Sequence, residues 1–298
     1  MKIGYFPGCS MEGSAPEYGE SLEAIAPFLD VQLQSVEDWN CCGASSAHAT
    51  NHDLAVALAA RNLALAEEQG LGELFAPCAA CYSRLAFARH ELGTQEGREH
   101  VGAIIGRDVH DRISILNILQ LLEARLDLIA EQSTDSLFGV KFACYYGCLL
   151  VRPPDVTAFD DPDQPSTMER IVQACSGTPV PWTMATECCG GGFSIARTDS
   201  VLRLGRGILE AARAAGAAAV VTACPMCHSN LDFRQEAMSR SGAPPMPILY
   251  ISQLIGIAFG LDDEALGLRR HFVDPRPFAE KLRAASTGLR MAEKGAKG

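Results

Sequence analysis

The sequence lacks several features that would assign it to familiar classes of protein. No stretch of the 298 residues reaches the run of about 18 apolar residues that a membrane-spanning helix needs. No Gly-x-Gly-x-x-Gly follows a strand-like segment and no Gly-Lys-Ser/Thr ends a loop, so flavin, nicotinamide and ATP sites are not expected. The ferredoxin-type run Cys-x-x-Cys-x-x-Cys-x-x-x-Cys-Pro is also missing, so the chain has no recognisable electron relay.

Positive charge is scarce as well. The formal net charge is −11, with 25 Lys and Arg residues against 36 Asp and Glu residues. This balance argues against binding to nucleic acid or to an anionic membrane surface. The N-terminal segment enters a strand-like pattern with no secretory leader before it, so we expect a cytoplasmic protein.

Cysteine, in contrast, is abundant, and ten of the twelve cysteines follow one pattern written twice. The pattern is a single cysteine, then an adjacent pair followed by glycine, then a Cys-x-x-Cys. The first set is Cys9, Cys41, Cys42, Cys78 and Cys81. The second set is Cys148, Cys188, Cys189, Cys224 and Cys227. In a reducing compartment such clusters indicate metal or redox chemistry rather than structural disulfides.

The spacing between the two sets indicates a tandem duplication. The single cysteines lie 139 residues apart, the adjacent pairs 147 and the Cys-x-x-Cys pairs 146. Around them, short apolar strand-like segments alternate with helical patterns, which is typical of an α/β fold. We therefore predict two pseudo-symmetric repeats of the CCG (Cys-Cys-Gly) type, each with a short sheet flanked by helices.

The predicted boundaries follow from the polar segments between these patterns. Residues 1–136 form the first repeat with a bridging helix, expected at 113–131, and residues 137–275 form the second repeat. The basic tail, 276–298, is expected to be a frayed helix or disordered. The proline- and aspartate-rich stretch 152–166 is expected to be a loop.

The adjacent cysteines are the most informative part of each set. Their Cα atoms are only about 3.8 Å apart, so two such thiolates reach one tetrahedral ion with strain but can serve neighbouring irons of a cluster. Five thiolates also exceed the four that a zinc site or a cubane cluster uses. Iron–sulfur clusters are therefore our first interpretation. Two structural zinc sites, each leaving one cysteine spare, and paired vicinal disulfides are the alternatives.

Three segments of the second half, together with the two cysteine sets, resemble the B subunit of heterodisulfide reductase. They are Tyr146–Pro153, Cys188–Gly192 and Cys224–His228. The resemblance extends over about residues 1–275, and all ten cysteine positions of that family are filled. It implies that each set of five cysteines binds a non-cubane [4Fe-4S] cluster. Some relatives carry zinc at the N-terminal set, so zinc is the alternative there.

The same resemblance implies a function and partners. The chain would be the catalytic iron–sulfur subunit of a heterodisulfide reductase-like complex, an oxidoreductase that cleaves or forms disulfide bonds of a small disulfide or thiol substrate at its two clusters. The clusters would flank a cavity and take one sulfur each. Electrons would arrive from a flavin subunit through a ferredoxin-like [4Fe-4S] subunit. Two alternatives stay open. One is a sulfur-oxidising bacterial homologue acting on thiols or persulfides, and the other is a zinc or iron–sulfur subunit that is structural or passes electrons without touching substrate.

Three further residues near the sets need an interpretation. His228 directly follows a cysteine of the second set at a predicted helix start. It could donate a proton to a departing thiolate as a catalytic residue, or make a purely structural hydrogen bond. Cys144 lies on a predicted strand and Cys175 at a predicted helix end, outside the repeated pattern. We expect both to be packed core thiols.

Overall fold

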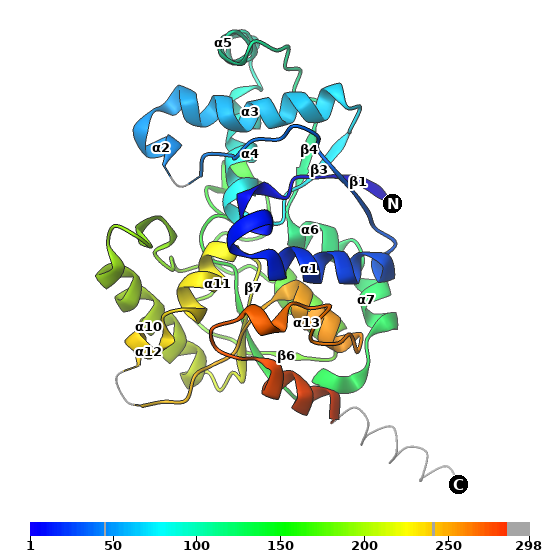
Figure 1. The fold of residues 1–298 in the computed structure, drawn as a ribbon, viewed down its shortest axis with the longest axis vertical. Coiled ribbons are helices and arrows are strands. Elements are labelled where there is room, and N and C mark those ends of the chain that lie inside the picture. Colours follow the sequence, from blue (N-terminus) through cyan, green and yellow to red (C-terminus); the bar gives the residue numbers. More distant parts are fainter. Residues whose placement is uncertain (45, 240–241, 285–298) are drawn as a thin grey trace.

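The computed structural model describes residues 1–44, 46–239 and 242–284, and it contains two parallel four-stranded sheets (Figure 1). The first sheet has the order β2-β1-β3-β4 and the second the order β6-β5-β7-β8. The first consists of β1 (Lys2–Tyr5), β2 (Gln32–Ser35), β3 (Glu73–Phe75) and β4 (Ser114–Leu116). The second consists of β5 (Lys141–Tyr145), β6 (Thr178–Pro179), β7 (Ala219–Thr222) and β8 (Ile248–Tyr250). The predicted α/β fold of two repeats, each with a short sheet flanked by helices, is confirmed.

The two sheets share one register scheme. β1 lies between β2 and β3, with Ile3 beside Leu33. In the second repeat, β5 lies between β6 and β7, with Ala143 beside Val220. The first strand of each repeat is therefore central in its sheet, and the second and third strands flank it.

Helices connect the strands of each repeat. The first repeat has α1 (Pro16–Ile25), α2 (Ala47–Thr50), α3 (His52–Glu68), α4 (Ala79–Glu91), α5 (Gln95–Ile105), α6 (Ile118–Glu123) and α7 (Leu126–Gln132). The second has α8 (Pro154–Thr157), α9 (Thr167–Ala174), α10 (Thr198–Ala214), α11 (Pro225–Asp232), α12 (Gln235–Met238) and α13 (Ile251–Ala258). Within the described ranges, none of the helices combines the length and apolar character needed to cross a membrane. The predicted basic tail is helical over 276–284, and the rest of it lies outside the described residues.

Local sequence signals explain where α3 begins and ends. The Asn51 side chain accepts a hydrogen bond from the backbone N–H of Leu54 at 2.8 Å, which caps the first turn. Gly70, just beyond the helix, has a φ of 71°, a left-handed conformation that favours glycine. The helix packs against α4, which carries the first Cys-x-x-Cys at its start.

The single helix predicted at 113–131 is wrong. This stretch begins with strand β4, and α6 and α7 follow it as two separate helices. Asn117 ends the strand and starts α6 through a capping box with Gln120, because each side chain bonds the other residue's backbone N–H. Arg125, with φ −129° and ψ 16°, then interrupts the helical path before α7. Leu116, Leu119, Leu122 and Leu126 fall at helical spacing through the whole stretch, so the apolar periodicity does not reveal these two breaks.

The two remaining predictions about local structure need smaller corrections. The stretch 152–166, predicted as a loop, contains the short helix α8. The predicted boundary after residue 136 falls within a 3-10 turn, Asp135–Leu137. That turn precedes β5 and ends the connection between the repeats.

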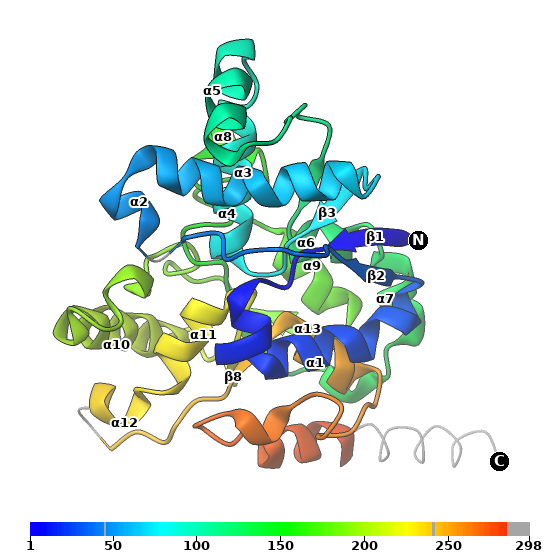
Figure 2. The same ribbon diagram turned by 45° about the horizontal axis from the view of Figure 1, so that its top comes forward.

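The two repeats meet along α1 and α13, which lie side by side in both views (Figures 1 and 2). The Oγ atoms of Ser21 on α1 and Ser252 on α13 are 2.7 Å apart. The Tyr18 and Tyr250 rings stack with centroids 4.2 Å apart and planes 6° apart. Buried hydrophobic side chains from both repeats form one continuous core. This packing fixes the position of one cysteine set relative to the other.

Candidate metal centres

The cysteines of both sets lie beyond the carboxyl ends of the strands. In the first repeat the single cysteine follows β1, the adjacent pair follows β2 and the Cys-x-x-Cys follows β3. In the second repeat the same three units follow β5, β6 and β7. Because carboxyl ends of neighbouring parallel strands open at one edge of a sheet, this order gathers each set at one place. The topology therefore explains how distant cysteines of one repeat come together.

The sulfur atoms of the first set are in contact. The Sγ atoms of Cys42 and Cys81 are 3.2 Å apart, and those of Cys9 and Cys41 are 3.9 Å apart. Cys9 and Cys41 are exposed to solvent, whereas Cys42, Cys78 and Cys81 are buried. The first set is thus a group of five converging thiols with one solvent-facing side.

One glycine in each repeat lies directly against a cysteine sulfur. Gly8 has a φ of 63°, and a Cβ built on it would lie 2.9 Å from the Sγ of Cys81. Gly147 occupies the same place in the second repeat, with a φ of 65° and a distance of 2.9 Å to the Sγ of Cys227. A side chain at either position would meet the sulfur and strain the backbone. Glycine before the single cysteine therefore keeps the space beside this sulfur free in both sets.

Thiol protons are shared unevenly within the first set. Hydrogen bonds from the thiols of Cys41 and Cys81 lower the pKa of Cys42 to about 4. The same interaction with Cys42 raises the pKa of Cys41. A hydrogen bond from the Cys81 thiol lowers the pKa of Cys78. Cys42 and Cys78 are therefore the members that favour the thiolate form, which is the form that binds metals.

The second set divides in the same way. A hydrogen bond from the Cys148 thiol lowers the pKa of Cys188 to about 6. A hydrogen bond from the Cys227 thiol lowers the pKa of Cys189. The pKa values of Cys148 and Cys227 are raised by these same partners. Each set thus offers both thiolates and thiols within hydrogen-bonding distance.

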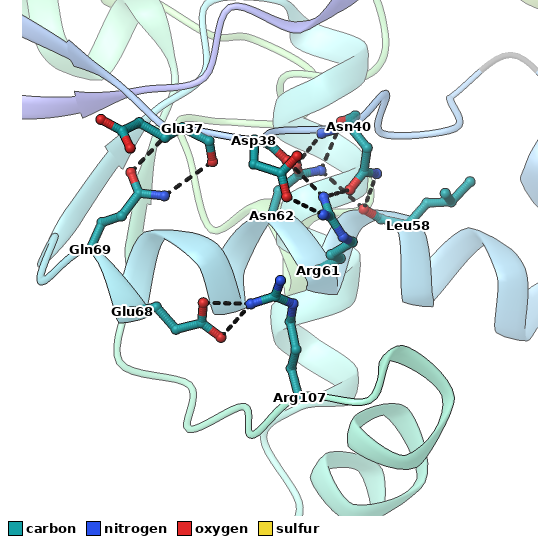
Figure 3. Close-up of polar contacts among 9 residues, drawn as sticks. All are labelled: Glu37, Asp38, Asn40, Leu58, Arg61, Asn62, Glu68, Gln69 and Arg107. Carbon is teal, nitrogen blue, oxygen red and sulfur yellow. Dashed lines mark hydrogen bonds and ion pairs between the residues drawn. The ribbon is translucent and has the colours of Figure 1, made fainter.

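Side chains of α3, and that of Gln69 directly after it, hold the segment that leads to the first adjacent pair (Figure 3). Asn62, which is fully buried, accepts a hydrogen bond from Asn40 N–H at 2.9 Å and donates one to the Asn40 carbonyl at 3.0 Å. Gln69 makes the same two-way contact with the backbone of Glu37, at 2.9 and 3.1 Å. Arg61 adds a bond to the Asn40 side chain at 2.9 Å. These contacts fix the backbone immediately before Cys41.

The second adjacent pair is held by the end of β5 instead. The backbone N–H groups of Tyr146 and Gly147 donate to the Ala185 carbonyl at 2.9 and 3.1 Å. The Tyr145 hydroxyl donates to the Glu187 carbonyl at 2.6 Å. The segment before Cys188 is therefore attached to the same strand end that carries the single cysteine of its set.

A cavity of about 170 Å³ lies between the two repeats beside the second set. All five cysteines of the second set line it, together with Tyr146, Leu149, Met226 and two glycines of the Gly190–Gly192 run. The opposite wall comes from the first repeat: Ala44, His48, Ala79, Ala80 and Arg84. Among the described residues, the lining includes no cysteine of the first set. The second set therefore faces a space that a small molecule can enter, and the first repeat supplies part of that space.

Arg84 is a residue of this site that sequence reasoning missed. It lies one turn of α4 beyond Cys81, and its guanidinium carbon lies 4.6 Å from the centre of the Phe87 ring. Beyond the thiol hydrogen bonds, its positive charge also lowers the pKa of Cys42. Its counterpart in the second repeat, at the offset of 146, is Asn230, whose Nδ2 lies 3.7 Å from the Cys189 sulfur. Its spacing of three residues from Cys81 was the signal that could have identified it.

His228 lies outside the residues that line the cavity. Its Nε2 is 3.1 Å from the Ile248 carbonyl and 3.3 Å from the Nδ1 of His271, and its ring stacks on Tyr250. Burial lowers its pKa well below the usual value, so the ring is neutral. Asp232, one turn further along α11, accepts hydrogen bonds from the N–H of Phe272 at 2.8 Å and from the next residue. These contacts hold the segment after His271 against the helix that carries Cys227.

Cys144 and Cys175 have the burial that was predicted for them. Both are completely inaccessible to solvent, on β5 and at the end of α9 respectively. Burial raises the pKa of each thiol, so both stay protonated. Neither lines the cavity beside the second set.

Two repeated segments of the chain match the family described as "Cysteine-rich domain", CCG, at residues 3–86 and 142–232. The strand order, the ten cysteines and this match define the class: the chain belongs to the CCG cysteine-rich domain family. Within that family its relatives include B subunits of heterodisulfide reductases, so the resemblance seen in the sequence is confirmed.

Three relatives illustrate the range of this family. The chain is 31% identical to the 8-methylmenaquinol:fumarate reductase membrane anchor subunit of Wolinella succinogenes, over 92% of this chain and 97% of that one. It is 28% identical to the B subunit of the ferredoxin/F420H2-dependent CoB-CoM heterodisulfide reductase of Methanosarcina acetivorans, over 97% and 99%. It is also 28% identical to a protein of Archaeoglobus profundus that is named as similar to the heterodisulfide reductase B subunit, over 89% and 92%. All three are full-length matches to proteins named as subunits or subunit-like.

A solved structure shares the fold. The crystal structure of a hypothetical protein from Helicobacter pylori superposes with a TM-score of 0.67 at 13% sequence identity. The superposition covers 92% of this chain and 52% of the other, so the chain spans about half of that protein's length. At this identity the likeness concerns the fold alone.

Proposed function

We propose that this protein is the catalytic iron–sulfur subunit of a heterodisulfide reductase-like complex. The observation that carries the proposal is the cavity between the repeats, because it brings all five cysteines of one set to a space of about 170 Å³. A purely structural metal site has no need of a cavity beside its ligands. We also propose that the protein works in the reducing cytoplasm, where clustered thiols of this kind serve as metal ligands.

The donor atoms fit the groups that the family implies. Each set supplies five thiols, and a glycine without a side chain leaves space beside the last of them. We assign a non-cubane [4Fe-4S] cluster to each set of five cysteines, which would supply single electrons and iron able to bind sulfur. Zinc is the alternative at the first set, since two thiolates on one zinc ion lie about 3.8 Å apart. The Cys9 and Cys41 sulfurs, at 3.9 Å, are compatible with that distance.

The chain's own residues prepare the cavity for a disulfide. Leu149, Met226 and the alanines of the opposite wall limit the access of water to the second set. Arg84 places a positive charge on the same wall and would stabilise a thiolate that forms when the S–S bond breaks. His228 makes its contacts outside this space, so we propose a positioning role for it, through α11, in place of the proton donation considered from sequence.

The reaction needs an external supply of electrons. Cleavage of R–S–S–R′ takes two electrons and two protons and gives two thiols. The sequence offers no flavin or ferredoxin-type motif. We therefore propose a ferredoxin-like subunit as the immediate donor, itself reduced by a flavin subunit. The test combines the anaerobic chain, a disulfide and a protein donor: reduction should require the ferredoxin-like partner, and full activity of the lone chain would contradict its assignment as a subunit.

A second candidate function is favoured by one comparison. The relative at 31% identity is named for a quinol-dependent fumarate reductase, so the chain could instead pass electrons within a complex of that kind without binding a disulfide. Disulfide-dependent oxidation of the reduced protein supports the first candidate. Reoxidation by a quinone but by no disulfide supports the second.

Metal analysis of the anaerobically purified protein tests the ligand sets under either candidate. We expect about eight irons and eight acid-labile sulfides per chain, four of each per set. Four irons with one zinc would assign zinc to the first set. Two zinc ions and no iron would contradict both candidates and leave a structural protein.

A further inference from the structure

One tyrosine hydroxyl touches both halves of the candidate site. Tyr18 on α1 is fully buried, and its hydroxyl oxygen lies 3.3 Å from the Pro77 carbonyl and 3.3 Å from the Ala223 carbonyl. These carbonyls belong to the residues directly before Cys78 and Cys224. A single hydrogen-bonding group therefore connects the backbones that carry one cysteine of each set.

The surrounding packing fixes this hydroxyl in place. The Tyr18 ring stacks on Tyr250, which stacks in turn on His228 with centroids 4.1 Å apart. The hydroxyl has one proton and two acceptors at equal distance, so it bridges them as a shared hydrogen bond. Its position does not depend on a flexible side chain or on solvent.

We propose that the Tyr18 hydroxyl is the electronic connection between the two cysteine sets. The route runs from Cys78 through its peptide bond to the Pro77 carbonyl, across the hydroxyl to the Ala223 carbonyl, and through the next peptide bond to Cys224. This inference rests on the proposed function, in which both sets carry iron. It adds a role for a residue that no cysteine motif marks.

The reaction explains why such a connection is needed. Disulfide cleavage takes two electrons, whereas an iron–sulfur site supplies them one at a time. Among the described residues, cysteines of the second set line the cavity and those of the first do not. On the proposed route, an electron held by the first set reaches the cavity by crossing from the first repeat to the second. The route through Tyr18 crosses the one shared hydrogen bond of its hydroxyl and otherwise follows covalent bonds near the cysteines.

Tyr18 itself is neither oxidised nor reduced on this route. Oxidation of a phenol to a neutral radical requires a base that takes its proton, and the hydroxyl contacts two amide carbonyls, which are very weak bases. Burial raises the pKa of Tyr18 well above its usual value, so ionisation is also disfavoured. The electron therefore passes by tunnelling through the bridge, and no atom or charge is left on the ring.

Tyr18→Phe tests the proposal, with Tyr82→Phe as the matched control. Tyr82 is also buried, and its hydroxyl also crosses between the repeats, to the Thr157 carbonyl at 2.8 Å, which is not next to a cysteine. The anaerobic, iron-loaded proteins are reduced by a flash-generated electron donor, and rapid-freeze EPR follows how the electron distributes between the two sets. We expect Tyr18→Phe to slow this equilibration several-fold and Tyr82→Phe to leave it at the wild-type rate, with equal iron content in all three.

Two results would overturn the proposal: a wild-type rate in iron-loaded Tyr18→Phe, or equal slowing in both variants. If Tyr18→Phe does not fold, the doubly reduced wild-type protein decides, because the bridge predicts measurable exchange coupling between the sets and its absence contradicts the route. Absence of iron from the wild-type protein would instead overturn the proposed function as well. The metal analysis therefore distinguishes a failure of the Tyr18 route from a failure of the proposed function.

Discussion

The two repeats share a strand order and a cysteine order but differ in what surrounds their thiols. In the first repeat, side chains of α3 hold the segment before the adjacent cysteines (Figure 3), while the second repeat uses the end of β5. The cavity between the repeats is lined by the second set. The duplicated scaffold thus preserves the order of strands and cysteines, while the residues around each set determine which other groups can reach its thiols. We interpret the second set as the one that faces the substrate and the first set as its neighbour in electron transfer.

The charge next to the buried cysteine of each adjacent pair differs as well. Arg84 acts on Cys42 in the first repeat, whereas the neutral Asn230 contacts Cys189 in the second. Arg84 also lines the cavity of the other set. A cation stabilises added negative charge, so we infer that the first site holds an electron more readily than it would with asparagine at this position.

The largest effect is expected from removing the second cysteine of one adjacent pair, which leaves that set with four thiols instead of five. Cys189→Ala should abolish disulfide turnover and the spectroscopic signal of the second set, or convert it to that of an ordinary cluster. Cys42→Ala should change the first set and leave the second signal in place. Metal analysis and EPR of both anaerobic variants measure this difference.

Two buried cysteines outside the sets provide the control for that prediction. Cys144→Ala and Cys175→Ala should keep the full iron content, since both thiols are protonated and packed in the core. Equal iron losses in all four variants would show that the ligand pattern is misread. Loss confined to the members of the sets would support the assignment of ten ligands.

Adding a methyl group at the equivalent glycine of each repeat should be nearly as damaging. Gly147→Ala places a Cβ 2.9 Å from the Cys227 sulfur at a φ of 65°, and Gly8→Ala does the same beside Cys81. Strain at a positive φ and the contact with sulfur should lower the free energy of unfolding by about 1–3 kcal/mol. Each variant should lose metal from its own set alone. Gly70→Ala, at a φ of 71° with open space around it, controls for backbone strain without a sulfur contact.

The side-chain support of the first adjacent pair predicts an effect confined to one set. Asn62→Ala would leave the N–H and carbonyl of Asn40 without their partners, which should lower the free energy of unfolding by about 1–3 kcal/mol. The first set should bind its metal more weakly, while the second set is unaffected. Urea unfolding and metal retention against a chelator measure the two effects. Equal metal loss from both sets would contradict separate support for the two pairs.

The sequence was sufficient to predict the duplication, the α/β class and the cysteine pattern. Those features depend on local spacing, above all on the repeat of Cys-Cys-Gly and Cys-x-x-Cys. The single helix at 113–131 failed because leucine periodicity outweighed the capping signal of Asn117. Apolar periodicity therefore predicted the class of the fold, but it did not predict that β4, α6 and α7 are separate elements.

The parts of the site that could not be predicted depend on contacts between distant residues. Tyr18 reaches Ala223 across 205 residues, and Arg84 enters a cavity whose other wall belongs to the second repeat. No sequence motif indicates that these residues lie close together in the fold. His228 shows the reverse case: it is adjacent in sequence to a cysteine of the set, yet its ring points toward Ile248 and His271. Adjacency to a ligand does not determine which way a side chain faces.

An effect that appears only as the pH changes concerns a carboxyl, Asp232, that the second repeat buries next to its cysteine helix. Asp232 corresponds to Ala86 in the first repeat at the offset of 146. Burial raises the pKa of Asp232 to about 6, although backbone hydrogen bonds from Phe272 and Val273 oppose the rise. Folding therefore favours the protonated carboxyl. Its contribution to stability is complete below about pH 4 and is lost as the pH rises through 6.

Asp232→Asn isolates this contribution from that of its histidine neighbours. A ring nitrogen of His228 and one of His271 lie within 4.8 Å of a carboxyl oxygen of Asp232. Burial lowers the pKa of His271 to about 4. Both histidines change the free energy of unfolding in the opposite direction, because burial lowers their pKa values. The contribution of His271 is lost as the pH falls from 6.5 toward 4. The free energy of unfolding of the wild-type protein therefore changes with pH through both the carboxyl and the histidines. The difference in this free energy between wild type and Asp232→Asn reports the carboxyl alone. We expect the wild-type protein to lose up to about 3 kcal/mol relative to Asp232→Asn between pH 4 and pH 7. Urea unfolding at several pH values measures the difference, and a constant difference across this range would show that the buried carboxyl does not titrate in the folded protein.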